Sequence, residues 1–222
     1  MCPLRWIQNM IKRFVDIVGA LLSLAVFGVP MLVIAAAIKI DTPGPVLYRG
    51  KRVGRYGRLF HILKFRTMVV NAERLGGPST AGDDPRITTA GRRLRKYKLD
   101  ELPQLLNVLA GSMSLVGPRP EVQQYVDTYT EEEEAILSVR PGITDYASLW
   151  NSDEGAVLAG HPDPEEAYLK LIRPTKLRLQ LKYVREQSLV TDMKIVLATI
   201  TSIAVRRRPP ALDAIERAGG GQ

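Results

Sequence analysis

An uncharged, strongly apolar stretch from Ile17 to Ile38 constrains this chain more than any other feature. As a straight helix, at about 1.5 Å per residue, it would extend for roughly 33 Å. That length matches the roughly 30 Å hydrocarbon core of a bilayer. We do not expect a cleaved signal peptide, because the stretch is long and no clear cleavage site precedes Lys39.

Two features favour a re-entrant segment over a simple membrane span. Pro30 lies inside the stretch, and a proline removes a helix hydrogen bond and clashes with the preceding turn. Both flanks are also basic, and a spanning helix would leave one basic cluster on the wrong side of the membrane. We therefore expect a helix broken at Pro30 that enters and leaves by the cytoplasmic face. A kinked spanning helix and a buried helix of a soluble protein are the alternatives. The basic flanking residues are Arg5, Lys12, Arg13, Lys39, Arg49, Lys51, Arg52 and Arg55.

The charge balance points to an anionic partner. The chain has 222 residues and a net charge of +8, which suits nucleic acid, lipid headgroups or a phosphorylated substrate. The single cysteine, Cys2, excludes an internal disulfide. His61 and His161 are isolated, so no zinc-binding spacing is present, and both are expected in ordinary structural roles.

The remaining pattern predicts a mainly helical α+β fold in three parts. Residues 1–40 would form the membrane anchor, residues 41–205 a cytosolic catalytic domain, and residues 206–222 a basic and then disordered tail. A small β-hairpin is expected, with strands at Val46–Arg49 and Leu59–Phe65 around a glycine-containing turn. Helices are expected at Ala90–Tyr97, Leu102–Ala110, Glu131–Val139, after Asp163, at Lys176–Glu186 and at Asp192–Val205.

The last of these helices is apolar and is followed by three arginines. This composition is typical of an amphipathic helix lying at a membrane surface. Packing of Asp192–Val205 against the core of the domain is an equally good interpretation, and the sequence leaves the choice open.

Two adjacent acids, Asp100 and Glu101, stand between a basic stretch and an apolar helix. Asp100 is expected to be the N-cap of that helix, where amide groups and the helix dipole would keep its carboxylate ionised. Such an acid beside bound phosphate can hold Mg²⁺ or attack phosphorus. On its own, the pair would usually be no more than a cap and a solvated first-turn acid. The functional interpretation depends on the basic and membrane-associated context.

Basic residues in three segments are candidate phosphate ligands. Arg92, Arg95 and Lys96 share one face of the predicted helix upstream of the acids. Arg119 lies between two prolines, which fix the backbone on both sides of it. The remaining two candidates, Lys64 and Arg66, alternate along the end of a predicted strand.

Together these segments resemble the bacterial sugar transferase family, the small monotopic phosphoglycosyl transferases. The resemblance runs from about Lys12 to Val205. It is most specific in the motifs KFRTM, DPRITTAGRRLRKYKLDELPQLLNVLAG, MSLVGPRPE and VRPGIT. Two departures concern Val29, where many members have serine before the proline, and the segment after VRPGIT, which begins at Asp145. The second departure makes this segment a candidate for variation in donor specificity.

The resemblance implies a membrane enzyme at the cytoplasmic face of the bacterial inner membrane. It would transfer a sugar-1-phosphate from a UDP-sugar to a polyprenyl phosphate, usually undecaprenyl phosphate, and release UMP. Asp100 would be the nucleophile, Glu101 would help to bind Mg²⁺ with Asp100, and the basic residues would surround the diphosphate. Those basic residues are Lys64, Arg95 and Arg119, and Arg66 remains a candidate phosphate ligand from its position near Lys64 at the end of the predicted strand. The sugar remains unassigned.

Two readings compete with this one. A basic nucleic-acid-binding protein would account for the net charge but not for the apolar stretch. A membrane scaffold without catalysis would account for the stretch but not for the paired acids. We favour the transferase, with UDP-sugar, polyprenyl phosphate and membrane lipids as partners and without nucleic acid. A homodimer is compatible with the sequence.

Overall fold

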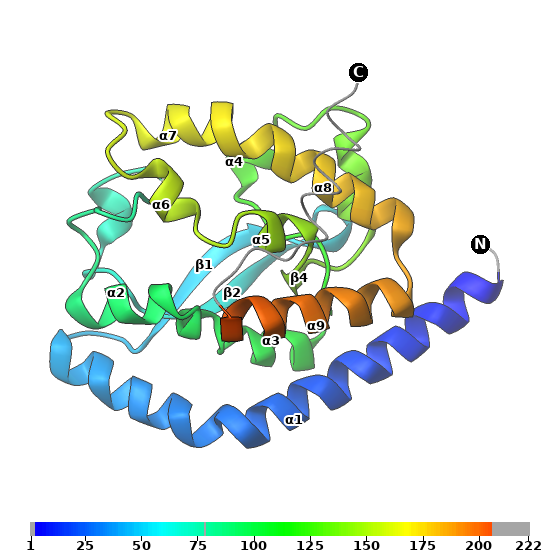
Figure 1. The fold of residues 1–222 in the computed structure, drawn as a ribbon, viewed down its shortest axis with the longest axis horizontal. Helices are drawn as coiled ribbons and strands as arrows, with labels where there is room; N and C mark the ends of the chain where they lie inside the picture. The colour runs from blue at the N-terminus through cyan, green and yellow to red at the C-terminus, as the bar shows by residue number, and fades with distance from the viewer. Residues whose placement is uncertain (1–2, 78, 206–222) are drawn as a thin grey trace.

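A computed structural model describes residues 3–77 and 79–205 of the chain. The described part is mainly helical, with two small sheets, which confirms the predicted α+β class. Figure 1 shows a long N-terminal helix lying beneath a body formed by the other elements. The predicted basic and disordered tail, residues 206–222, lies outside the described residues.

The N-terminal helix α1 spans Pro3–Asp41 and includes Pro30. It runs without interruption through the proline, so the expected break at Pro30 is not seen, and the helix is bowed instead (Figure 1). By length and composition it could cross a membrane, and most of its apolar side chains are exposed. The most exposed of them include Leu22, Val26, Val29, Leu32 and Val33. Whether it spans the membrane or re-enters on one side stays a prediction.

Polar contacts tie the N-terminal half of α1 to the body. Lys12 Nζ lies 2.6 Å from Asp192 Oδ2 and 3.0 Å from the carbonyl of Val116. The buried Asp16 carboxylate accepts hydrogen bonds from Ser114 Oγ, at 2.8 and 3.0 Å, and from the amide of Leu115, at 3.0 Å. These contacts fix a segment of α1 well before its apolar centre.

A second contact ties the opposite end of α1 to the same body. Asp41 Oδ2 accepts a hydrogen bond from the amide of Ala90 at 3.1 Å. Ala90 lies in α2, which spans Thr89–Lys96. The bowed helix is therefore bonded to one body both before and after its apolar centre.

The hairpin is confirmed, although its first strand is longer than expected. Strands β1 (Leu47–Val53) and β2 (Leu59–Phe65) pair in antiparallel fashion from one end to the other. The turn at η1, Arg55–Gly57, places Tyr56 in the left-handed region at φ 59°. A second, parallel pair joins β3 (Ser114–Val116) to β4 (Gly142–Thr144).

The helices agree with the sequence in order but not always in type. Helix α2 begins at the N-cap Thr88, whose side chain accepts from the amide of Gly91. The expected helix at 131–139 is instead the 3₁₀ segment η4, Glu133–Ser138. Asp163 caps α7 as predicted. The other elements are η2 (Ala72–Arg74), η3 (Leu99–Glu101), α3 (Gln104–Ala110), α4 (Gln123–Val126), α5 (Tyr146–Trp150), α6 (Glu154–Leu158), α7 (Pro164–Ala167), the π-helical η5 (Tyr168–Ile172), α8 (Arg173–Glu186) and α9 (Leu189–Val205).

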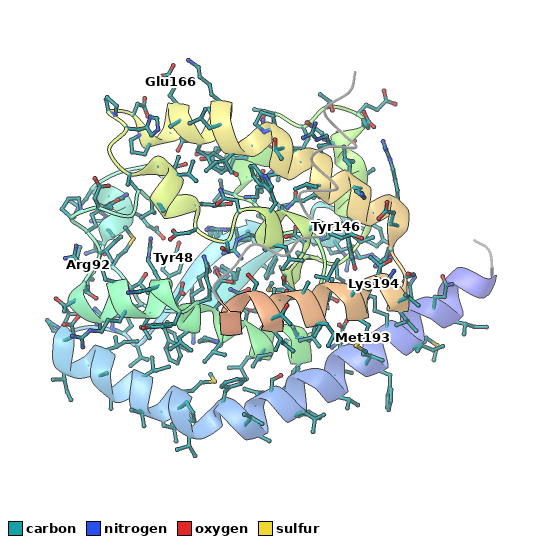
Figure 2. The ribbon with its side chains drawn as sticks, in the orientation of Figure 1. Tyr48, Arg92, Tyr146, Glu166, Met193 and Lys194 are labelled. Atoms are coloured by element: carbon teal, nitrogen blue, oxygen red, sulfur yellow. The ribbon has the colours of Figure 1, made fainter. Side chains whose placement is uncertain are left out.

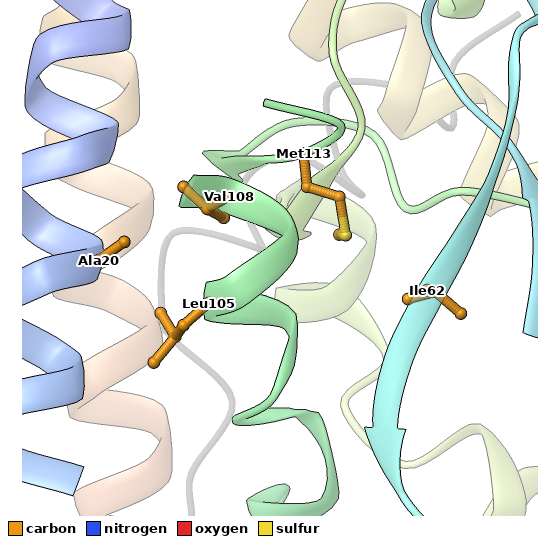
Figure 3. Packing of buried hydrophobic residues seen from close by; sticks show 5 residues of the cluster. All are labelled: Ala20, Ile62, Leu105, Val108 and Met113. Carbon is orange, nitrogen blue, oxygen red and sulfur yellow. The ribbon is translucent and has the colours of Figure 1, made fainter. Parts of the chain in front are cut away.

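One apolar cluster joins α1 to the hairpin and to α3. Ala20, Ile62, Leu105, Val108 and Met113 are each no more than 5% exposed and pack together (Figure 3). Because α3 directly follows Asp100 and Glu101, this packing sets the position of the paired acids relative to the membrane helix.

Helix α9 packs against the core on one face and exposes apolar side chains on another, so it has features of both a core helix and a membrane-surface helix. Ile195 is 1% exposed and lies in a core cluster with Val116, Leu149 and Tyr183. Another face of the helix is apolar and exposed, and Met193 on this face is labelled in Figure 2. The exposed residues are Val190, Met193, Leu197 and Ile200.

Candidate active site

One large cleft of about 1660 Å³ collects the candidate site residues predicted from the sequence. It is bounded by the hairpin, by the segment that carries the paired acids and by the loop around Arg119. Side chains from α1 and α9 also reach it. The predicted residues that line it are Lys64, Arg66, Arg92, Arg95, Lys96, Asp100, Glu101 and Arg119.

Asp100 and Glu101 lie in the short 3₁₀ segment η3, just before α3. The residue before η3, Lys98, adopts a left-handed conformation at φ 56°, which turns the chain from α2 into η3. The expectation that Asp100 caps α3 is therefore wrong. The N-cap position of α3 belongs to Pro103, and no side chain caps η3 or α3.

Glu101 is held between two cations. Lys64 Nζ lies 3.0 Å from Glu101 Oε1, Arg119 Nη1 lies 3.1 Å from Oε2, and Arg119 Nη2 also donates to Oε1. Burial alone would raise the pKa of Glu101, but the charges of Arg119 and Lys64 outweigh it and hold the pKa well below its usual range. Glu101 is thus an ionised acid whose charge is already balanced by protein groups.

Asp100 has a different environment. Its side chain is 7% exposed, and its Oδ1 is buried without a hydrogen-bond partner among the described residues. Burial raises the pKa of Asp100, although the positive charge of Lys64 acts in the opposite direction. Helix amides are expected from the sequence to keep the Asp100 carboxylate ionised, but its side chain does not cap η3 or α3. A buried oxygen without a partner is poorly solvated and remains able to accept a bond from a ligand.

Arg119 belongs to a backbone loop that is fixed on both sides. Its amide donates to Asp145 Oδ2 at 3.2 Å, and its carbonyl accepts from Gln180 Nε2 at 3.1 Å. Asp145 is fully buried. A methyl group on Gly117 would lie 2.4 Å from the carbonyl of Arg140, so the loop approaches β4 more closely than any side chain allows. The guanidinium therefore starts from a well-defined position.

The other two predicted phosphate ligands make contacts of their own. Arg95 Nε donates to Thr67 Oγ1 at 2.9 Å, and its pKa is lowered by burial. Arg66 donates to the carbonyls of Thr42 and Pro43, at 2.8 and 2.6 Å, and so holds the segment that follows α1. Phosphate binding by either residue stays a prediction. Arg66 has fewer hydrogen-bond donors left for a phosphate, because two of them already bind backbone carbonyls.

A second charged cluster in the cleft was missed by the sequence analysis. Lys176, from α8, lies 3.2 Å from Glu121 Oε1 and 3.6 Å from Glu154 Oε1, and it donates to Tyr168 Oη at 3.0 Å. Only Glu121 carried a signal, as the acid that ends the MSLVGPRPE motif. The partners are distant in sequence, so no local pattern could reveal the cluster.

The acids of the first cluster can be tested for their fit to Mg²⁺. No group of three or more His, Cys, Asp or Glu that could hold a metal occurs in residues 3–77 and 79–205. Mg²⁺ is usually bound through one or two carboxylates together with substrate phosphates and waters, so a complete protein cage is not needed. Asp100 Oδ1, which has no hydrogen-bond partner among the described residues, fits that donor set, whereas both oxygens of Glu101 are engaged by Lys64 and Arg119.

Comparison with known proteins agrees with the motifs in the cleft. Residues 7–206 match the family described as bacterial sugar transferase. A UDP-glucose:undecaprenyl-phosphate glucose-1-phosphate transferase from Caulobacter vibrioides is 42% identical over 196 residues, which cover 86% of this chain and 69% of the relative. The exopolysaccharide production protein ExoY from Sinorhizobium fredii is 34% identical, with 92% and 90% covered.

A third relative is much longer than this chain. It is a UDP-N-acetylgalactosamine-undecaprenyl-phosphate N-acetylgalactosaminephosphotransferase from Aeromonas hydrophila, 44% identical over 57% of this chain, and the match spans only 30% of its length. The relatives thus differ in size and in the sugar that they are named for. The match to the family nevertheless runs through almost the whole chain described here, and the chain belongs to the bacterial sugar transferase family.

Proposed function

We propose that this protein transfers a sugar-1-phosphate from a UDP-sugar to a polyprenyl phosphate, normally undecaprenyl phosphate, and releases UMP. Such a reaction is the first membrane step in assembling a surface glycan. The names of the Caulobacter and Aeromonas relatives support the reaction class, although they differ in the sugar. The observation that carries the proposal is the unequal pair of acids, one neutralised by cations and the other buried with an unpartnered oxygen.

Asp100 is the nucleophile in this proposal. One oxygen of its carboxylate attacks the phosphorus that bears the sugar, and as that bond forms, the bond from phosphorus to the UMP oxygen breaks and UMP leaves. An oxygen of the lipid phosphate then attacks the same phosphorus, and the Asp100 carboxylate is released unchanged. Each step exchanges one phosphorus–oxygen bond for another, so no oxidant or further reactant is needed.

The cations and Glu101 organise the diphosphate. Lys64 and Arg119 already meet at the Glu101 carboxylate, so their positive charges are in place before the donor binds. Charges that need no rearrangement stabilise the charge developing on the phosphoryl oxygens most effectively. Mg²⁺, held by Asp100 and Glu101 with the donor phosphates, would supply additional charge neutralisation at the leaving phosphate.

The membrane arrangement fits a lipid acceptor. The cleft is lined by Ser23 and Phe27 of α1 as well as by Asp100, so the apolar helix borders the space in which phosphate chemistry would occur. The helix α1 bonds to the same body on both sides of its apolar centre, through Asp16 before it and Asp41 after it. A helix held in this way favours entry and exit at one face. These contacts support our proposal that residues 1–40 form a re-entrant anchor at the cytoplasmic face of the bacterial inner membrane and that residues 41–205 form the catalytic domain.

A lipid-free measurement tests the proposal. With a panel of UDP-sugars and Mg²⁺ but no lipid phosphate, the wild-type protein should release up to one equivalent of UMP per chain. The peptide that carries Asp100 should gain the mass of the phosphosugar. Addition of undecaprenyl phosphate should then give full turnover with ping-pong kinetics. Fast turnover without any burst or adduct would reassign Asp100 as a metal ligand or general base.

A further inference from the structure

Glu154 is an acid that faces a cleft otherwise suited to anions. It opens α6 and lines the cleft that also contains Asp100 and Arg119. Its pKa is lowered, because the charges of Lys176, Arg119, Lys98 and Lys64 together outweigh the effect of burial. Glu154 is therefore ionised and lies within electrostatic reach of the same cations that surround the paired acids.

Lys176 and Glu154 differ in how far their polar groups are used by contacts within the protein. Lys176 is almost fully buried and donates a hydrogen bond to Tyr168 Oη at 3.0 Å. It also forms ion pairs with Glu121 Oε1 at 3.2 Å and, at a longer distance, with Glu154 Oε1 at 3.6 Å. Glu154 is 37% exposed, touches Lys176 only at 3.6 Å and accepts no hydrogen bond from any described residue. Its carboxylate oxygens remain able to accept hydrogen bonds from a ligand.

The backbone next to Glu154 is held against another segment that lines the cleft, around Gly82. The amide of Gly82 donates to the carbonyl of Gly155 at 2.8 Å. A methyl group on Gly82 would lie 3.2 Å from that same oxygen, so the two segments meet at backbone distance. The carboxylate therefore belongs to a fixed part of the cleft wall.

An ionised carboxylate accepts hydrogen bonds and cannot donate them. It would repel the diphosphate of the donor, so its partner must be an uncharged group with hydroxyl donors. The uncharged group bonded to the phosphorus that Asp100 attacks is the sugar. We infer that Glu154 accepts hydrogen bonds from hydroxyl groups of the donor sugar and discriminates between donors, with Lys176 as its positioning residue. This inference rests on the proposed transfer reaction.

The test is the substitution Glu154→Gln, which keeps the size of the side chain and removes its charge. We expect kcat/KM for the preferred UDP-sugar to fall about tenfold or more, because a charge-assisted hydrogen bond to a hydroxyl is lost. The fall should differ between epimeric donors, so that the preference among sugars becomes weaker. Inhibition by UDP, which has no sugar on its diphosphate, should not become weaker than in wild type, because the substitution removes a charge that repels the diphosphate.

The matched control is Glu166→Gln. Glu166 also forms an ion pair with a lysine, Lys170, but both side chains are largely exposed on the outside of the body (Figure 2). This variant should keep the kinetics of wild type with every donor. Glu154→Ala provides a second variant of the site, and UDP inhibition no weaker than in wild type would establish that the cleft is intact.

Three results would overturn the inference. An equal fall for all donors would mean that Glu154 acts on the shared chemistry. An equal weakening of UDP would place its contact on the ribose or the diphosphate, and unchanged kcat/KM would remove the contact altogether. Failure of the proposed function would look different, because wild-type protein would then release UMP from no UDP-sugar at all.

Discussion

Arg119 grips Glu101 at two points, with Nη1 3.1 Å from Oε2 and Nη2 donating to Oε1. Lys64 approaches the same carboxylate at 3.0 Å. Because Glu101 engages both of these cations, they form no hydrogen bond with the neighbouring Asp100. Asp100 Oδ1 is left without a hydrogen-bond partner among the described residues. Two adjacent acids are thereby given two different electrostatic environments.

Asp100→Asn should abolish turnover. An amide is a poor nucleophile, and the loss of an attacking group typically costs about 10³-fold or more in kcat. Steady-state UMP release measures the effect. The exposed Asp83 offers a control, because Asp83→Asn removes an acid that lies outside the cleft. Turnover of the Asp100 variant within tenfold of wild type would exclude the assignment.

Arg119→Lys should behave as a disruptive change although the charge is kept. A lysine cannot reproduce the planar, two-point contact with Glu101 or a similar grip on phosphate oxygens. We expect kcat/KM to fall by at least about tenfold with little change in the melting temperature, since the backbone contacts of residue 119 to Asp145 and Gln180 remain. Kinetics equal to wild type would make Arg119 a structural residue of its loop.

The pH dependence should report the raised pKa of Asp100. Attack requires the ionised carboxylate, so kcat/KM should rise with pH through an apparent pKa above that of an ordinary aspartate. Lys64 lowers the pKa of Asp100, and Lys64→Met should therefore shift this limb to higher pH. Arg93→Met, at an exposed position outside the cleft, is the control that should leave the limb in place.

Glu101→Gln should cost stability as well as activity. The change would leave Lys64 and Arg119 without their shared counter-charge, and breaking a buried ion pair in this way costs about 3–5 kcal/mol. The lowered pKa of Glu101 also predicts how stability depends on pH. The ionised side chain stabilises the folded protein above the pKa of an unfolded glutamate, and this stabilisation is lost as the pH falls through the lower pKa of the folded state. The variant should lack this acid-dependent loss.

Activity and metal dependence separate the two roles of Glu101. If it also helps to hold Mg²⁺, Glu101→Gln should need a higher Mg²⁺ concentration for half-maximal activity. Thermal unfolding between pH 3 and 7, read beside a Mg²⁺ titration, measures both effects. An unchanged melting temperature would contradict the ion-pair argument, and an unchanged titration would contradict the metal role.

Local signals predicted the local features of this fold. Alternation and the Gly54–Gly57 turn predicted the hairpin, and Gly111 ends α3 in a left-handed conformation at φ 86°. The same kind of reasoning misplaced Asp100 as a helix cap. A carboxylate before a helix can turn back to the helix amides or forward into a cleft, and the packing of distant segments decides between the two.

The parts that escaped prediction depend on contacts between distant residues. Lys176 and Glu121 meet only because α8 lies across the loop that follows Arg119. Similarly, Gly91 brings α2 so close to the carbonyl of Thr67 that a methyl group there would lie 2.0 Å from it. This close approach helps to place Arg95 beside the paired acids. In the sequence, however, Gly91 and Thr67 look like an ordinary helical glycine and an ordinary threonine.

The last prediction concerns the topology of α1. Lys12 and Asp16 near one end and Asp41 at the other bond to the same body, so both ends should face the cytoplasm. With Cys2→Ser, single cysteines at the exposed positions Gln8 and Arg58 should both resist an impermeant thiol reagent in intact cells and both react after lysis. Reaction of the Gln8 site alone in intact cells would establish a spanning helix. Replacing Lys12 and Asp16 by leucine removes the ties to Asp192 and Ser114 and lengthens the apolar stretch. This double variant should therefore shift part of the population towards spanning, with Gln8→Cys becoming reactive from outside.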